Sequence, residues 1–258
     1  MKYNYHTHTF RCHHADGTEE EYVQRAVAGG VTHMGFSDHM AFRFPDGSES
    51  IFRIYTAEAP LYIDTVRSLA EKYKDQIEIH CGFEMEYYPE FFEEMRAKAV
   101  EYGAEYLILG QHFLAPECYR DSMHSMQENK PDEALTAFTS LVIEAMKTGA
   151  FTYVAHPDIC VYNGDPALYE AEVRRLCRAS KEYDVPLEIN FLGIRTNRFY
   201  PNEEFWRIAG EEGVSVVFGF DAHDVENACD DASRVEAMRL VNTYHLNLLD
   251  NVTLKPLK

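Results

Sequence analysis

Long hydrophobic runs are absent from this chain of 258 residues. No stretch of about 18 apolar residues occurs, which argues against a membrane-spanning helix. The opening MKYNYHTHTF lacks the apolar segment of a secretory signal peptide. The six cysteines include no C-x-x-C pair, so they favour reduced thiols over a disulfide framework or a cysteine zinc site. We therefore expect a cytoplasmic protein with no membrane partner.

Basic residues are also scarce, with 24 Lys and Arg against 43 Asp and Glu and a formal net charge of −19. Because nucleic acids are usually bound through basic patches, this charge argues against a long nucleic acid as partner. Bound divalent cations would offset part of the charge, so the acidity remains compatible with a small phosphorylated substrate. The sequence leaves the oligomeric state open.

Strand-like and helix-like segments alternate along the chain. Short β-branched or aromatic runs predict seven strands, at Tyr3–Tyr5, Val31–Ser37, Ile77–Phe83, Tyr106–Gly110, Thr152–Ala155, Pro186–Ile189 and Val214–Gly219. Amphipathic stretches predict helices at Glu19–Ala28, Glu58–Tyr73, Phe91–Tyr102, Asp132–Lys147, Leu168–Tyr183, Glu203–Gly210 and Ser233–Tyr244. Since right-handed βα units in series close into a barrel, we predict one α/β barrel domain over residues 1–258, with a doubly wound open sheet as the alternative.

Seven of the twelve histidines fall at or just beyond the C-terminal end of a predicted strand. Catalytic groups of barrels and open α/β sheets lie where strands end, so these side chains should converge. Residues i and i+2 of a strand point the same way, which pairs the first and third residues of H-T-H and of D-A-H. The candidate ligands are His6, His8, His14, His39, Glu84, His112, His156, Asp221 and His223. Imidazole and carboxylate ligands without thiolate suit zinc, manganese or iron.

The loop after the first predicted strand contains two adjacent histidines. We prefer His14 over His13 as a ligand, and Asp16 in the same loop is a further candidate. Four other histidines lie inside strands, in a loop or near the tail, and we expect them to be packing or surface residues: His33, His80, His124 and His245.

The order of these motifs resembles the PHP family, named for domains of bacterial DNA polymerases and of a histidinol phosphatase. The motifs are H-T-H at 6–8, S-D-H at 37–39, G-F-E at 82–84, G-Q-H at 110–112, A-H-P at 155–157 and D-A-H at 221–223. The resemblance implies a distorted seven-stranded (β/α)7 barrel that binds three divalent transition-metal ions. It implies a first ion on His6, His8, Glu84 and Asp221, a second on Glu84, His112 and His156, and a third on His14, His39 and His223.

Among stand-alone members, the chain looks most like histidinol-phosphate phosphatases, through H-H-A-D-G-T at 13–18 and L-E-I-N at 187–190. The resemblance implies hydrolysis of L-histidinol phosphate to L-histidinol and phosphate in histidine biosynthesis. Those enzymes usually carry an arginine shortly after the A-H-P motif, whereas this chain has D-I-C-V-Y at 158–162. Arg195 and Arg198, after the sixth strand, are therefore the candidate phosphate clamp, with Arg195 preferred and Asn190 assisting.

The expected mechanism uses a hydroxide between two metals that Glu84 bridges, because a bound divalent ion lowers the pKa of water towards about 7. Glu84 and Asp221 should be essential, and Asp16 is a candidate acid for the leaving alkoxide. Two alternatives remain: a phosphoesterase or phosphodiesterase acting on another small phosphorylated metabolite or nucleotide, and a non-catalytic metal-binding domain. The last is disfavoured because structural zinc sites are usually closed tetrahedra of cysteine and histidine.

Overall fold

The computed structural model describes residues 2–128 and 130–257. Its centre is one parallel sheet of eight strands that follow one another in the order of the chain. The strands are β1 Tyr3–Asn4, β2 His33–Phe36, β3 Glu78–Met85, β4 Tyr106–Leu109, β5 Phe151–Val154, β6 Leu187–Asn190, β7 Ser215–Gly219 and β8 Asn247–Leu248. The sheet curls, and a parallel bridge between Thr7 and Ala222 links the chain beyond β1 to the chain beyond β7.

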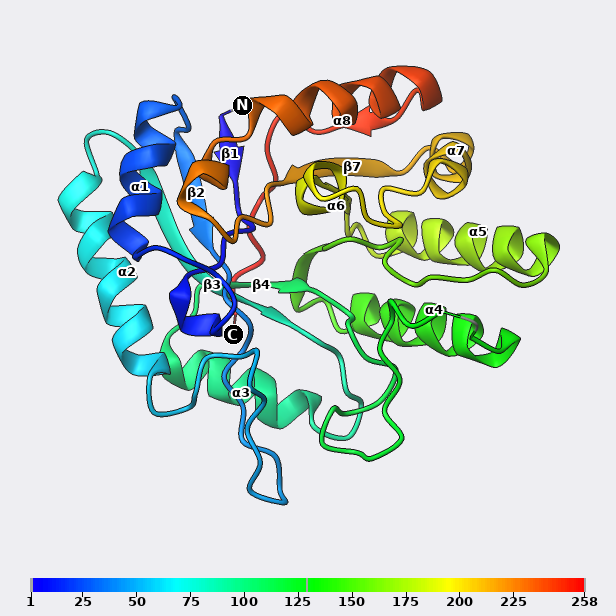
Figure 1. The fold of residues 1–258 in the computed structure, drawn as a ribbon, viewed down its shortest axis with the longest axis horizontal. Coiled ribbons are helices and arrows are strands. Elements are labelled where there is room, and N and C mark those ends of the chain that lie inside the picture. Colours follow the sequence, from blue (N-terminus) through cyan, green and yellow to red (C-terminus); the bar gives the residue numbers. More distant parts are fainter. Residues whose placement is uncertain (1, 129, 258) are drawn as a thin grey trace.

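Helices cover the outside of the curled sheet, with α1, α2 and α3 on one side and α4, α5, α7 and α8 on the other (Figure 1). Their bounds are α1 Glu19–Ala28, α2 Ala59–Tyr73, α3 Phe92–Tyr102, α4 Asp132–Lys147, α5 Pro166–Glu182, α6 Phe191–Arg195, α7 Glu203–Glu212 and α8 Asp231–Tyr244. Two 3-10 turns, Phe10–Cys12 and Val225–Ala228, lie in loops. Within the described ranges, every helix is too short or too polar to span a bilayer.

The predicted parallel α/β fold is confirmed, but the predicted number of seven strands was wrong. The eighth strand, β8, contains two residues and pairs with Ser215 and Val216 of β7. A strand this short shows no alternation of polar and apolar residues, so the sequence pattern could not indicate it. The five-residue helix α6 was also missed. It spans little more than one turn, which is too short to show a helical period in the sequence.

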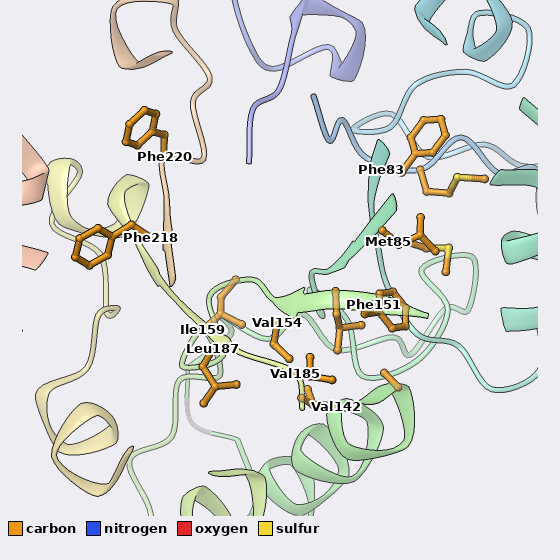
Figure 2. Close-up of a cluster of buried hydrophobic side chains, with 14 of the residues drawn as sticks. Phe83, Met85, Val142, Phe151, Val154, Ile159, Val185, Leu187, Phe218 and Phe220 are labelled. Carbon is orange, nitrogen blue, oxygen red and sulfur yellow. The ribbon is translucent and has the colours of Figure 1, made fainter. Parts of the chain in front are cut away.

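Alternation along the strands divides the apolar residues between two layers. Leu107 and Leu109 of β4 pack in the large cluster beneath the helices, whereas Tyr106 and Ile108 of the same strand pack in a second cluster. Figure 2 shows the larger cluster, with Phe151 and Val154 of β5 near Val142 of α4, and with Phe83 of β3 and Phe218 of β7 on opposite sides of the view. Each such buried side chain contributes about 1.5–3 kcal/mol, so this layer supplies most of the folding energy.

The second cluster is built around Tyr106, at the start of β4. Its hydroxyl donates to the carbonyl oxygens of Tyr5 at 2.9 Å and Phe36 at 3.1 Å. Gly35 makes room for this ring, since a Cβ there would lie 2.9 Å from the ring carbon Cδ1 of Tyr5 and closer still to the Tyr106 hydroxyl. Val252, in the segment after β8, packs in the same cluster. The interior near the amino ends of the strands is therefore filled.

Candidate metal centre

The predicted ligands surround one cavity of about 390 Å³ at the carboxyl ends of the strands. Eight of the nine line it: His8, His14, His39, Glu84, His112, His156, Asp221 and His223. His6 lies beneath them, fully buried, with its Nε2 atom 3.2 Å from Nε2 of His8 and 3.5 Å from Oδ1 of Asp221. Seven separate segments of the chain thus deliver side chains to one place.

Glu84, near the end of β3, lies at the centre of this group. Its Oε1 atom is 2.9 Å from Nε2 of His156 and 3.6 Å from Nε2 of His112. Its Oε2 atom is 3.1 Å from Nδ1 of His39. Gly110 makes this position possible, because a Cβ there would overlap the Glu84 carboxylate. The two oxygens of Glu84 therefore face different candidate ligands, His39 on one side and His112 and His156 on the other.

The adjacent histidines of the first loop point in different directions. The Nε2 atom of His14 is 3.2 Å from Nε2 of His223, and its ring also lies near His39. The ring of His13 instead packs on Tyr55, with 4.4 Å between ring centroids. His13 has a left-handed backbone conformation with φ of 66°, which turns its side chain away from that of His14. The structure brings His14 to the cluster.

Several buried polar atoms in the cluster make no hydrogen bond among the described residues, although some of them lie at ion-pair distance from one another. They include Oε2 of Glu84, Oδ1 of Asp221 and Nδ1 of His39. Leaving such an atom unsatisfied costs about 1–3 kcal/mol, and more when the group is charged. The atoms are lone-pair donors of the kind that zinc, manganese and iron accept, and several sets of three lie within 4.8 Å of one another. The residues present therefore fit a cluster of divalent ions.

The charge distribution of the cavity also favours cations. Burial alone would lower the pKa of His6, but the carboxylates of Glu188, Asp221 and Glu84 outweigh it and raise this pKa to about 10. Burial likewise opposes ionisation of Glu84, yet the surrounding histidines, His112 first, hold its pKa well below the usual range. The buried carboxylates thus favour positive charge beside them.

Two carboxylates that the sequence analysis did not select orient the histidines. Glu188 of β6 is hydrogen-bonded through Oε1 to Nδ1 of His6 at 2.8 Å, and its Oε2 atom accepts the backbone N–H of His156 at 3.0 Å. Glu86 is hydrogen-bonded in the same way to Nδ1 of His112 at 2.8 Å. Such partners fix the tautomer of a metal-binding histidine and leave its Nε2 atom free. The spacing E-x-E at 84–86 and a glutamate inside the buried strand L-E-I-N were signals that could have revealed them.

The two candidate arginines occupy different places. The guanidinium of Arg195 donates through Nη1 to the carbonyl oxygen of Phe220 at 2.6 Å and through Nη2 to that of Asp221. Arg198 lines the cavity, and its Nη1 atom donates to the hydroxyl of Tyr200 at 3.0 Å. This geometry does not support the preference for Arg195 as the phosphate clamp, because Arg195 is not among the cavity residues and two of its donors contact backbone carbonyls.

Two other predicted site residues also lie differently from expectation. Asn190 does not line the cavity, since its Nδ2 atom donates to Glu188 and Asp221 and its Oδ1 atom accepts the N–H of Gly193 at the start of α6. The side chain of Asp16 is exposed and is not among the cavity residues. Neither residue is placed to contact a substrate in the cavity, and Asp16 is not placed to act as its acid.

The fold and the site together define a class of protein: a curled parallel α/β sheet with a cluster of histidines and carboxylates at the carboxyl ends of its strands. Residues 4–191 match the PHP domain. The chain belongs to the PHP family.

Relatives of the chain match over most of its length. It is 25% identical to a probable histidinol-phosphatase of Deinococcus radiodurans over 228 residues, which cover 84% of this chain and 85% of that protein. It is 29% identical to a probable phosphatase of Caldanaerobacter subterraneus subsp. tengcongensis over 245 residues, covering 93% of this chain and 82% of that protein.

Among solved structures, the chain is similar to histidinol phosphate phosphatase of Lactococcus lactis subsp. lactis, solved in complex with zinc, L-histidinol and phosphate. The TM-score is 0.73 at 20% identity, and the match covers 100% of this chain and 98% of that chain. At this identity the similarity establishes the shared fold.

Proposed function

We propose that this chain is a metal-dependent phosphatase that hydrolyses L-histidinol phosphate to L-histidinol and phosphate. The observation that carries the proposal is the set of buried, unsatisfied ligand atoms of Glu84, Asp221 and His39 in one cavity. Membership of the PHP family and the relative named a probable histidinol-phosphatase support the substrate. One domain over residues 1–258 and a cytoplasmic location stay predictions.

Three divalent ions would be held by overlapping sets of these side chains. The first set is His6, His8, Glu84 and Asp221, the second is Glu84, His112 and His156, and the third is His14, His39 and His223. The close approaches of His6 to His8 and of Glu84 to His156 support the first two sets. The approach of His14 to His223 supports the third. When bound, such ions lower the pKa of coordinated water and stabilise negative charge on phosphoryl oxygens.

The residues of the chain bind and orient the substrate around these ions. Arg198 lines the cavity and would bind the phosphoryl group through charge-assisted hydrogen bonds, with the buried Tyr200 hydroxyl holding its side chain. Arg195 and Asn190 act indirectly. Arg195 holds the carbonyls of Phe220 and Asp221, and Asn190 donates to Oδ2 of Asp221 at 3.0 Å. Together they would hold the Asp221 carboxylate, whose backbone has a φ of 47°.

A second candidate is a phosphoesterase acting on another small phosphorylated metabolite or nucleotide. The observation that favours it is the small number of basic groups for phosphate. The segment 158–162 contains no arginine, and among the described residues that line the cavity Arg198 is the only arginine or lysine. The two candidates differ in leaving group and share the same metal site.

The test is phosphate release by metal-loaded protein from L-histidinol phosphate, generic aryl phosphates and nucleotide diesters, with metal content measured on the same sample. We expect about three equivalents of transition metal per chain and the highest kcat/KM on L-histidinol phosphate. Protein that contains no metal and takes up none on titration would contradict the metal site itself. A strong preference for another substrate would replace the first candidate with the second.

A further inference from the structure

One wall of the cavity, beside the candidate ligands, contains two phenylalanine rings. Phe52 and Phe113 stack there, with ring centroids 5.7 Å apart and an angle of 20° between the rings. The ring of Phe52 also contacts His39, a candidate ligand, at 5.4 Å between centroids. A substrate whose phosphate is bound at the metal centre would therefore place its organic part against this aromatic wall.

Carboxylates that could pair with a cationic substrate group are lacking from this wall. Among the described residues that line the cavity, only Glu84 and Asp221 carry carboxylates, and both are candidate metal ligands. Recognition of the leaving group must therefore rest on aromatic packing and on neutral hydrogen bonds.

His124 provides one neutral donor at a fixed position. Its Nδ1 atom accepts the backbone N–H of Met126 at 3.0 Å, so this nitrogen carries no proton and the proton of the neutral ring is on Nε2. The Nε2 atom has no hydrogen-bond partner among the described residues. The side chain of His124 lines the cavity. The sequence analysis had expected His124 to be a packing or surface residue.

The position of His124 is determined by its neighbours. Its backbone pairs with Phe113 in an antiparallel bridge, and its ring packs edge-on against the Phe113 ring at 4.9 Å between centroids. The ring therefore extends the aromatic wall and cannot turn over without losing the Met126 hydrogen bond. A donor held in this way is suited to select a substrate by an acceptor atom.

We propose that His124 is a specificity-determining residue, whose Nε2–H group donates to the unprotonated imidazole nitrogen of L-histidinol phosphate while that imidazole packs on Phe52 and Phe113. This inference rests on the proposed function. The substrate ring offers what the wall can recognise, namely an aromatic face and one nitrogen acceptor. An analogue with a phenyl ring keeps the aromatic face and lacks the acceptor.

The experiment compares kcat/KM of metal-loaded protein for L-histidinol phosphate and L-phenylalaninol phosphate, which differ only in the ring. The wild type should prefer the imidazole substrate by about tenfold, the size of one well-placed neutral hydrogen bond. His124→Phe keeps an aromatic ring and removes the donor, so the preference should fall to about one. His124→Gln offers an amide N–H in its place and should recover part of the preference.

His33→Phe is the matched control, because His33 lies at the start of β2, at the opposite end of the sheet. It should keep the wild-type preference. Zinc content is measured for every variant, so that lost metal is distinguished from lost substrate contact. An unchanged preference in His124→Phe, or an equal loss on both substrates together with lost zinc, would overturn the inference and leave the proposed function standing. Failure of the wild type to hydrolyse L-histidinol phosphate would overturn both.

Discussion

The two ends of the curled sheet differ in how their polar groups are satisfied. At the amino end, Tyr3 donates through its hydroxyl to the carbonyl oxygen of Leu249 at 2.7 Å, and Tyr106 donates to two carbonyls. At the carboxyl end, Glu84, Asp221 and His39 keep buried atoms without partners among the described residues. The first arrangement is satisfied by the chain itself, whereas the second would be completed by the divalent ions proposed above.

We infer from this difference that the amino ends of the strands contribute mainly to stability and that the carboxyl ends contribute mainly to function. Strand β4 illustrates it, since Tyr106 begins the strand and fills the interior, while His112 follows its end and lines the cavity. Changes at the carboxyl end should therefore affect metal binding and turnover more than folding, and changes at the amino end should do the reverse.

Glu84→Gln should have the largest effect. The amide removes the bridging charge while keeping the shape, so kcat should fall by at least about a hundredfold, with loss of bound metal. The far-UV circular dichroism should stay as in the wild type. Metal analysis and phosphate release measure the first two effects, and Glu94→Gln, an exposed glutamate on α3, is the control. Full activity in Glu84→Gln would place the bridging carboxylate elsewhere.

Glu188→Gln should have the next largest effect. The change weakens the hydrogen bond that fixes His6, so metal affinity should fall by about 10- to 100-fold, as for other carboxylates that orient metal-binding histidines. Competition with a chelator measures the affinity. Glu182→Gln, at the exposed end of α5, should show no change. An unaltered affinity in Glu188→Gln would mean that this contact does not support the site.

Arg198→Ala and Arg195→Ala should affect different properties, the first substrate binding and the second metal binding. Arg198→Ala should raise KM and lower kcat/KM by about tenfold or more at unchanged metal content, because a charge-assisted contact to phosphate is lost. Arg195→Ala should instead weaken metal binding, because it releases the backbone of Asp221. Steady-state kinetics with metal analysis separate the two, with Arg234→Ala on α8 as control. If Arg195→Ala alone raised KM, the two roles would have to be exchanged.

Tyr106→Phe should have the smallest effect on the site and act on stability alone. Loss of a buried hydroxyl that donates to two carbonyls should lower the free energy of unfolding by about 1–2 kcal/mol. Urea unfolding of the metal-loaded protein measures it, with the half-exposed Tyr183→Phe as control. Metal content and kcat/KM should match the wild type. A large loss of metal in Tyr106→Phe would show that the two ends are coupled.

Most of the candidate ligands could be selected from the sequence because they stand at or just beyond a recognisable strand end, whereas His14 lies in the loop after the first strand. The H-x-H and D-x-H spacings need only the alternation of a strand, which is a local property. Glu86 and Glu188 were missed because the histidines to which they are hydrogen-bonded lie far away in the chain, His112 for Glu86 and His6 for Glu188. The contacts of Arg195 could not be foreseen for the same reason, since the carbonyls to which it donates lie 25 and 26 residues further along.

The sequence by itself determined the parallel α/β class and the chemical nature of the centre, because hydrophobic periodicity and ligand type are properties of short segments. It also selected histidines and carboxylates that lie around one cavity in the structure. Only the tertiary structure decided which of His13 and His14 joins the cluster, which arginine enters the cavity and where His124 directs its N–H group. These outcomes depend on backbone conformation and on contacts between distant segments, which no local pattern encodes.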